Sequence, residues 1–216
     1  MKRSAGALLI CLAGCGARQP AAAPALGSAA LTGARDSGAR DWRAVATPAD
    51  RDRMRRWRDA WTDGLAQAQR SDAAAVAAQG ALFAADAALD DPVPPVGAYR
   101  CRMFKLGSPG GGGLGFVAYG WFDCRVAATA DGAVRLSKLT GSQRQAGSVY
   151  PAAPTRAAFL GTLMLGDEAR AYAYGVDKTR DVAGWVERVA GRRWRVVMPY
   201  PAFESVLDVL ELVPAE

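Results

Sequence analysis

Several side chains able to do chemistry lie close together in the stretch Lys138-Leu139-Thr140-Gly141-Ser142-Gln143-Arg144. If the apolar residues before it point into a core, the alternation of a strand sends Lys138 inward as well. A desolvated lysine can act as a base or bind an anion, and a Ser-Lys pair can activate a nucleophile without histidine. Lys138 and Ser142 are therefore candidate catalytic residues, and Lys138, Thr140 and Arg144 are candidate ligand contacts. The alternative, which we favour, is a polar hairpin tip with Lys138 displaced by a bulge or held in a salt bridge.

A second group of charges lies in the longest connection between the predicted strands. It contains Asp167-Glu168 and the run from Asp177 to Asp181. Paired carboxylates can serve acid–base chemistry or hold calcium, but the spacing matches no twelve-residue calcium loop. Solvated charges with local ion pairs are the simpler interpretation. Tyr172 and Asp181 remain candidate ligand contacts, since Tyr172 and Tyr174 could line a ligand mouth or cover the end of the core.

The composition excludes several classes of catalyst. The chain has no histidine, so Ser-His-Asp and Cys-His catalysis and a conventional zinc site are excluded. The glycine-rich segment 109–115 lacks the Lys-Ser or Lys-Thr of a phosphate-binding loop and precedes a predicted strand, so it indicates a hairpin loop. The tryptophans could stack on sugars, but most occupy positions that favour core packing. We expect no metal and no cofactor.

The N-terminus has the pattern of an export signal. Lys2 and Arg3 precede a short apolar run, which ends in Leu12-Ala13-Gly14-Cys15. This segment resembles the lipobox of bacterial lipoproteins, in which the cysteine receives the lipid. The resemblance implies that residues 1–14 are a signal peptide and that the mature chain begins at a lipidated Cys15. A transmembrane anchor is the alternative, but the apolar run is much shorter than the roughly 20 residues that span a bilayer.

Gly16 follows the lipid-bearing cysteine, and the absence of an Asp there favours the outer membrane, facing the periplasm. Removing the signal lowers the formal charge from +6 to +4, because it removes Lys2 and Arg3 and no acid. This charge is too weak and dispersed to indicate a nucleic-acid partner. The export signal also takes Cys11 away, which leaves Cys101 and Cys124 in a compartment that permits disulfides. We predict that they are bridged; two free buried thiols are the alternative.

Residues 15–46 are rich in Ala, Gly, Pro and Ser and predict a flexible tether behind the lipidated cysteine. Thr47-Pro48-Ala49-Asp50 is a helix start, with Thr47 as N-cap. Apolar residues at steps of three and four follow it, and Ser71-Asp72 can cap a second helix that ends near Phe83. We therefore predict a helical hairpin within residues 47–90.

From Tyr99 onward, short runs rich in Val, Tyr, Phe and Trp alternate with turn residues. Strands are predicted near 98–106, 116–127, 133–140, 145–150, 157–165, 182–189, 192–198 and 206–213. Short turns between consecutive strands indicate antiparallel pairing, and about eight such strands form an open sheet, a sandwich or a small barrel. The fold class is α+β: a helical hairpin packed on a meandering antiparallel sheet or small barrel, in one domain spanning 47–216.

Six segments of the chain resemble the domain of unknown function 4893 family, which consists of uncharacterised exported bacterial proteins. They include Tyr99-Arg100-Cys101-Arg102, the stretch from Lys138 to Arg144, and Phe203-Glu204-Ser205-Val206-Leu207-Asp208. The resemblance covers most of residues 41–214. It implies one domain in the envelope and brings no catalytic role with it.

These patterns support one main hypothesis and two alternatives. We expect a lipid-anchored, disulfide-bonded protein of the bacterial cell envelope that is a non-catalytic binding or structural module. Its partners would be the membrane, through the lipid, and an envelope protein, a glycan or a small ligand. The first alternative is a hydrolase of envelope substrates that uses Lys138 and Ser142. The second is an inhibitor of a cell-wall-attacking enzyme, which rests on analogy of architecture alone.

Overall fold

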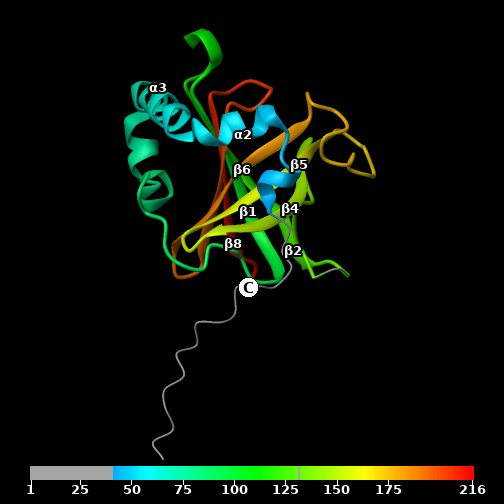
Figure 1. Cartoon of the computed structure of the whole chain (residues 1–216). Coiled ribbons are helices and arrows are strands. Elements are labelled where there is room, and N and C mark those ends of the chain that lie inside the picture. The colour runs from blue at the N-terminus through cyan, green and yellow to red at the C-terminus, as the bar shows by residue number, and fades with distance from the viewer. Residues whose placement is uncertain (1–40, 131) are drawn as a thin grey trace, which may run out of the picture. The chain divides into compact units, whose positions relative to one another are not determined.

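The protein is a closed, eight-stranded antiparallel barrel with helices on its outside (Figure 1). The computed structural model describes residues 41–130 and 132–216. The strands are β1 (Gly97–Leu106), β2 (Phe116–Ala128), β3 (Val134–Lys138), β4 (Gln143–Ala153), β5 (Arg156–Leu165), β6 (Asp181–Ala190), β7 (Arg193–Pro199) and β8 (Leu207–Pro214). Each strand pairs with the next, and β1 pairs with β8. This confirms the predicted α+β class, and the sheet closes into a barrel.

Side chains fill the interior of the barrel. Alternate residues of each strand point inward, among them Met103 of β1, Phe159 of β5 and Leu210 of β8, and together they form one buried cluster. An eight-stranded barrel is just wide enough for its own side chains to fill it. A ligand would therefore bind at an end of the barrel or on its outside, because the middle is already occupied.

The predicted disulfide between Cys101 and Cys124 is present inside this core, with the two Cα atoms 5.8 Å apart. The two cysteines are not directly opposite each other. Cys101 pairs with Phe122 and Tyr99 pairs with Cys124, so the bridge runs diagonally between β1 and β2. The ladder between the two strands continues, with one register shift after Arg102, to the pair Leu106 and Phe116.

The helices lie outside the barrel and follow one another around it (Figure 1). They are α1 (Trp42–Val45), α2 (Pro48–Arg55) and α3 (Trp57–Ala77), followed by the short 3-10 helix η1 (Gly80–Phe83). Thr47 caps α2 as predicted, since its Oγ1 accepts a hydrogen bond from the Asp50 N–H at 3.2 Å. The start predicted at Ser71-Asp72 is a break within α3, where Asp72 accepts from the Ala75 N–H at 2.9 Å.

Two predictions about the N-terminal part differ from the structure. The predicted second helix does begin at Asp72, but it continues α3 directly after a kink, so the two predicted helices are not joined by the turn of a hairpin. The domain also begins before residue 47. Asp41 caps α1, and the buried Trp42 packs edge-to-face on Trp185, with their ring centroids 5.2 Å apart. A tryptophan gains more by packing on the barrel than by remaining in a solvated tether. The predicted signal peptide, Cys15 and tether up to residue 40 lie outside the described residues.

Different helices cover different strands. Helix α3 and η1 place Trp57, Trp61 and Phe83 on an outer cluster formed with β1, β7 and β8. Helices α1 and α2 place Trp42 and Met54 on β5 and β6. Within the part of the chain described here, no helix combines the length and the apolar character needed to cross a bilayer.

A buried arginine fixes the end of the helical part onto the sheet. Arg195 of β7 lies 2.6 Å from the Glu187 carboxylate of β6 and donates to the carbonyl oxygens of Leu82 at 2.7 Å and Ala84 at 2.8 Å. The buried Glu187 also pairs with Arg156 at 2.5 Å. A buried ion pair adds little net stability, but this one specifies where the segment after η1 lies.

Candidate functional site at the four-loop end of the barrel

Four connections lie at one end of the barrel, because alternate loops of an antiparallel meander share an end. They are residues 107–115, 139–142, 166–180 and 200–206, and we call this the four-loop end. The first of them projects beyond the rest of the barrel (Figure 1). The opposite end has the loops 129–133, 154–155 and 191–192, together with the start of β1 and the end of β8.

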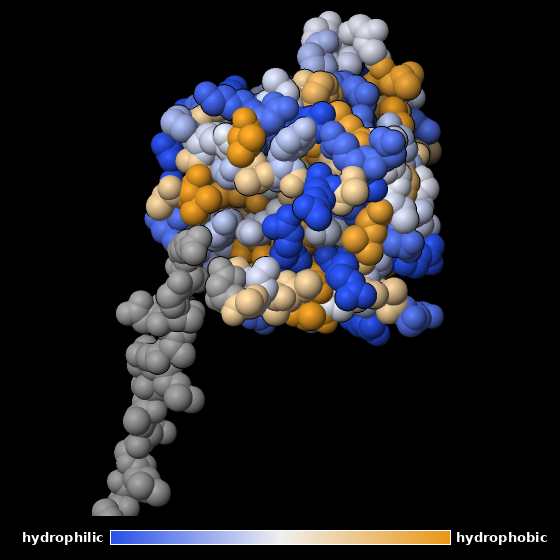
Figure 2. Space-filling view, turned by 90° about the vertical axis from the view of Figure 1, so that its right-hand side faces the viewer, coloured by the Kyte–Doolittle hydropathy of each residue, from blue (hydrophilic) through white to orange (hydrophobic). Residues whose placement is uncertain are grey.

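Each of the four loops exposes at least one large apolar side chain. The described part of the chain has nine exposed large hydrophobic residues, and five of them lie on these loops: Leu114, Leu139, Tyr172, Val176 and Phe203. On the face seen in Figure 2, hydrophobic residues form small patches among hydrophilic ones. Exposed apolar side chains gathered at one end of a molecule are typical of a contact surface.

A buried pair of opposite charges lies just inside this end. Lys105 of β1 and Asp208 of β8 are cross-strand partners, and the Lys105 Nζ is 3.6 Å from an Asp208 carboxylate oxygen. Ser205 donates its hydroxyl to Asp208 at 2.5 Å. The exposed carboxylate of Glu204 lies 3.0 Å from the Lys105 Nζ. Glu204 itself has a φ of +69°, a strained backbone conformation of the kind that occurs at functional sites.

Burial sets the protonation of this pair. Loss of solvation raises the pKa of Asp208 to about 6, against the opposing effects of Lys105 and Ser205. Burial alone would lower the pKa of Lys105, but the Asp208 and Glu204 carboxylates outweigh it and raise that pKa. The pair is therefore charged at neutral pH, and Asp208 can take up a proton in mildly acidic solution.

A small cavity with both polar and apolar walls adjoins the charged pair. It lies between the start of β6 and the loop 200–206, and its volume is about 30 Å³. Its lining includes Arg53, Lys105, Gln145, Asp181, Phe203 and Asp208. Gln145 Oε1 and one Asp181 carboxylate oxygen are buried without a protein partner. A cavity of this size holds about two water molecules, which would satisfy such atoms. The cavity can accept one small polar group at most.

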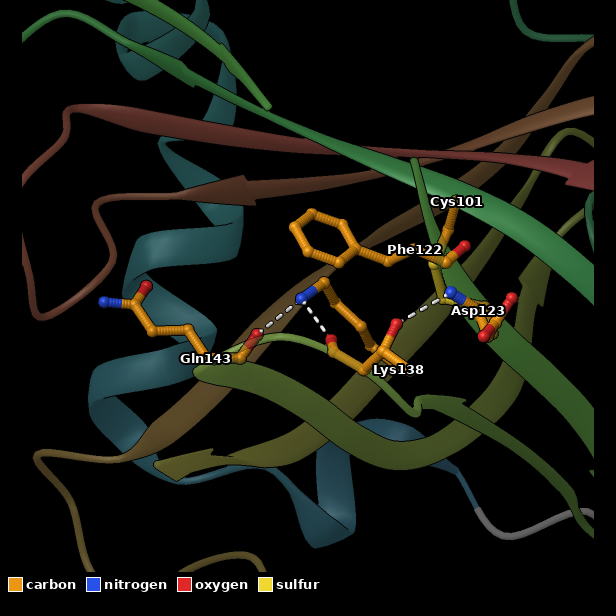
Figure 3. Close-up of a disulfide and its surroundings, with 7 residues drawn as sticks. Cys101, Phe122, Asp123, Lys138 and Gln143 are labelled. Atoms are coloured by element: carbon orange, nitrogen blue, oxygen red, sulfur yellow. Dashed lines mark hydrogen bonds between the residues drawn. A yellow bond between two sulfur atoms is a disulfide. The ribbon is translucent and has the colours of Figure 1, made fainter. Parts of the chain in front are cut away.

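Lys138 points inward beside the disulfide (Figure 3). Its Nζ donates to the carbonyl oxygens of Thr140 at 2.7 Å and Gln143 at 2.8 Å, and it lies 3.6 Å from the centroid of the Phe122 ring. Loss of solvation, with a smaller effect of Arg144, lowers the pKa of Lys138 to about 8. Through these two hydrogen bonds Lys138 links the loop 139–142 to the start of β4.

The loop that covers Lys138 depends on a glycine. Gly141 has a φ of +91°, and a Cβ at this position would stand 2.7 Å from the Lys138 Nζ and 2.8 Å from the Phe122 ring. Ser142 is exposed, and its carbonyl oxygen accepts the Gly166 N–H at 2.8 Å. The ammonium of Lys138 is directed at two backbone carbonyls, so the geometry is that of a closed loop and does not form a lysine-activated serine.

The other predicted site residues also hold loops in place. Thr140 Oγ1 accepts from the Asp123 N–H at 3.0 Å. Arg144 donates to the carbonyl oxygens of Gly166 at 3.0 Å and Glu168 at 2.7 Å, which ties the loop 166–180 to β4. Asp181 accepts from the Gly175 N–H at 2.9 Å and lines the cavity. Tyr172 is exposed, with the Arg180 guanidinium 5.1 Å from its ring.

Sequence reasoning missed the Lys105–Asp208 pair. Both residues interrupt apolar runs: Lys105 stands between Phe104 and Leu106, and Asp208 between Leu207 and Val209. A charge within an apolar strand is a usable signal, because such a charge must either face solvent or find a partner. A single sequence does not tell which partner it finds, since β1 and β8 lie at opposite ends of the chain segment that forms the barrel.

Comparison with known proteins gives a family and nothing closer. The model of the family described as "Domain of unknown function (DUF4893)" matches residues 42–212. No curated protein matches the chain, and no solved structure does. Among the residues that the structure describes, no three His, Cys, Asp or Glu side chains come together as metal ligands.

Proposed function

The chain belongs to the DUF4893 family, and we propose that it is a lipid-anchored protein of the bacterial envelope that binds a partner at its four-loop end. In this proposal Cys15 carries the lipid, the outer membrane is the site of attachment, and the domain faces the periplasm. The bound partner is another envelope protein, and the domain itself performs no catalysis.

Two observations support a location in the bacterial envelope. The segment Leu12-Ala13-Gly14-Cys15 resembles a lipobox in residue type at every position. The buried disulfide between Cys101 and Cys124 fits an oxidising compartment, because reduced thiols are the rule in the cytosol. The two observations are independent, since one comes from the N-terminal signal and the other from the core of the barrel.

One observation carries the binding role. Of the nine exposed large hydrophobic side chains among the described residues, five lie on the four loops of one barrel end, where polar groups are also present. Protein interfaces combine an apolar centre with polar surroundings. The filled interior argues against a carrier of a large ligand, and the cavity behind the rim admits no more than one small group. A partner protein that lies across the loops suits this surface best.

Site-specific photocrosslinking in living cells tests the proposal. A photoreactive amino acid replaces either Val176 or Phe203 at the four-loop end, and Val96 serves as a matched control, because it is an exposed valine before β1. We expect Val176 and Phe203 to yield an adduct of the same size, and Val96 to yield none. Equal adducts from all three positions, or turnover of an envelope substrate that Lys138→Ala abolishes, would contradict the proposal.

A further inference from the structure

A groove lined by arginines lies beside the point where the chain enters the domain. Its walls include Trp42 and Arg43 of α1, Arg51 and Arg55 of α2, and Trp185 of β6, and its volume is about 520 Å³. Asp41, the first described residue, directly precedes Trp42. Trp42 itself lines the groove.

The spacing of the residues in α2 places the arginines here. Pro48, Arg51 and Arg55 are three and four residues apart, so they share one face of the helix with Asp52. Asp50 and Met54 are the buried residues of α2 and bring it onto the barrel. Burial of one face of this short helix thus presents the basic face outward.

The groove has more positive than negative charge. Asp52 is the acidic residue of the lining, and the carboxylate of Asp41, beside the groove, lies 3.8 Å from the Arg43 guanidinium. A hydrogen bond from Arg56 at 2.8 Å, aided by Arg55, lowers the pKa of Asp52, and these two arginines neutralise its charge. Arg51 donates to the carbonyl oxygens of Arg43 at 2.9 Å and Ala46 at 2.6 Å, and no carboxylate of the described residues pairs with it. The lining keeps a surplus of guanidinium charge that an anion could neutralise.

Two tryptophans complete the site. The Arg43 guanidinium lies 4.6 Å from the centroid of the Trp42 ring, and Trp42 packs edge-to-face on Trp185. Arginine recognises phosphate through its planar array of donors. Trp42 is buried and Trp185 is partly buried, so their two rings form an apolar floor beside the guanidinium groups. The arginines therefore supply the contacts to phosphate.

We propose that this groove binds the phosphate of an anionic phospholipid headgroup in the membrane to which the chain is attached. The choice of a membrane lipid over a free anion rests on the proposed function, because a lipid at Cys15 keeps that membrane within reach of Asp41. Binding here turns α1 and α2 towards the bilayer, in addition to the covalent anchor.

A titration of the intact, lipidated protein in zwitterionic detergent tests this. The probes are dihexanoyl phosphatidylglycerol, dihexanoyl phosphatidylcholine and inorganic phosphate, and the readout is the set of indole N–H signals in a nitrogen-15 NMR spectrum. We expect phosphatidylglycerol to shift the Trp42 and Trp185 signals along a saturable curve, and phosphatidylcholine and inorganic phosphate to shift them far less. Inorganic phosphate that binds as tightly as the lipid would overturn the choice of a headgroup, and the absence of any shift would overturn the site.

Two double variants distinguish the effect of the groove arginines on lipid binding from the effect of the protein's overall charge. Arg43→Gln with Arg55→Gln removes two exposed groove charges, and Arg125→Gln with Arg135→Gln removes two exposed charges from β2 and β3. We expect the first to weaken phosphatidylglycerol binding at least fivefold and the second less than twofold, with the other indole signals unchanged in both. Equal weakening would contradict the proposal. Incorporation of palmitate at Cys15 is measured separately, so failure of the anchor and failure of the groove give different results.

Discussion

Lys105 and Asp208 face each other across the seam where the first and last strands close the barrel, with Nζ 3.6 Å from a carboxylate oxygen. Both side chains are almost fully buried. Two charges taken out of water stabilise a protein little, and burial raises the pKa of Asp208 to about 6. The pair therefore makes the stability of the closed barrel depend on pH.

Replacement of Asp208 by Asn should change that dependence. The folded protein binds the Asp208 proton more tightly than the unfolded chain does, so this group lowers the free energy of unfolding as pH rises from about 4 to about 6. The stability of Asp208→Asn relative to the wild type should then rise by up to about 3 kcal/mol between pH 4 and pH 7. Urea unfolding at several pH values measures it. Asp63→Asn, at an exposed position of α3, is the control and should show no such trend.

Lys138 should change the free energy of unfolding with pH in the opposite direction. Its pKa of about 8 lies below the value in an unfolded chain, so the folded state loses its proton first. This group therefore contributes increasing stability as pH rises from about 8 to about 10. Lys138→Met lacks this contribution and should lose about 2 kcal/mol relative to the wild type between pH 7.5 and pH 10. For Lys178→Met, at an exposed lysine, the difference in stability from the wild type should not change with pH. Parallel curves for Lys138→Met and the wild type would show that Lys138 is not desolvated.

Gly141→Ala should open the loop above Lys138. An alanine there is strained by the φ of +91° and collides with the Lys138 ammonium and the Phe122 ring. Gly132→Ala has the same kind of strain at a φ of +78°, but its Cβ meets nothing within 4 Å. We expect Gly141→Ala to cost about 1–2 kcal/mol more than Gly132→Ala, because it adds a steric clash to the strain. Equal losses in thermal or urea unfolding would mean that the loop relaxes freely.

Loss of the disulfide should weaken the barrel without changing its topology. The bridge joins residues 23 apart in the sequence, and the loop-entropy model then gives a stabilisation of about 3 kcal/mol. The double variant Cys101→Ala with Cys124→Ala should unfold at a lower urea concentration, because its free energy of unfolding is lower by about 3 kcal/mol. It should retain its far-ultraviolet circular dichroism. An unchanged midpoint would imply that the bridge is strained or only partly formed in solution.

Much of the sheet could be predicted, because alternation and turn residues are local signals. All eight strand ranges lie within about three residues of their predicted positions. The closure of β1 on β8 and the diagonal disulfide are relations between distant segments, which no local pattern specifies. The helical break at Asp72 lies where a cap was predicted, whereas the break at Arg56 was not predicted, because the apolar stripe in the sequence continues through it.

The candidate site shows the same division. An inward Lys138 follows from alternation with Leu136, and both side chains are buried in the structure. Its partners could not be predicted, because Thr140 and Gln143 contribute backbone oxygens, which have no signature in the sequence. Trp121 illustrates a wrong expectation of burial. It is 41% exposed, and the guanidinium groups of Arg100 and Arg102 lie over its ring.

The proposed location in the envelope depends most on the lipid at Cys15, and metabolic labelling tests for that lipid directly. Cells that express the chain are grown with radiolabelled palmitate, alongside cells that express Cys15→Ser. We predict that label enters the wild-type protein and not the variant, and that the labelled form fractionates with the outer membrane. An unlabelled wild-type protein recovered from the soluble fraction of the cell would contradict the proposed location and the binding role that rests on it.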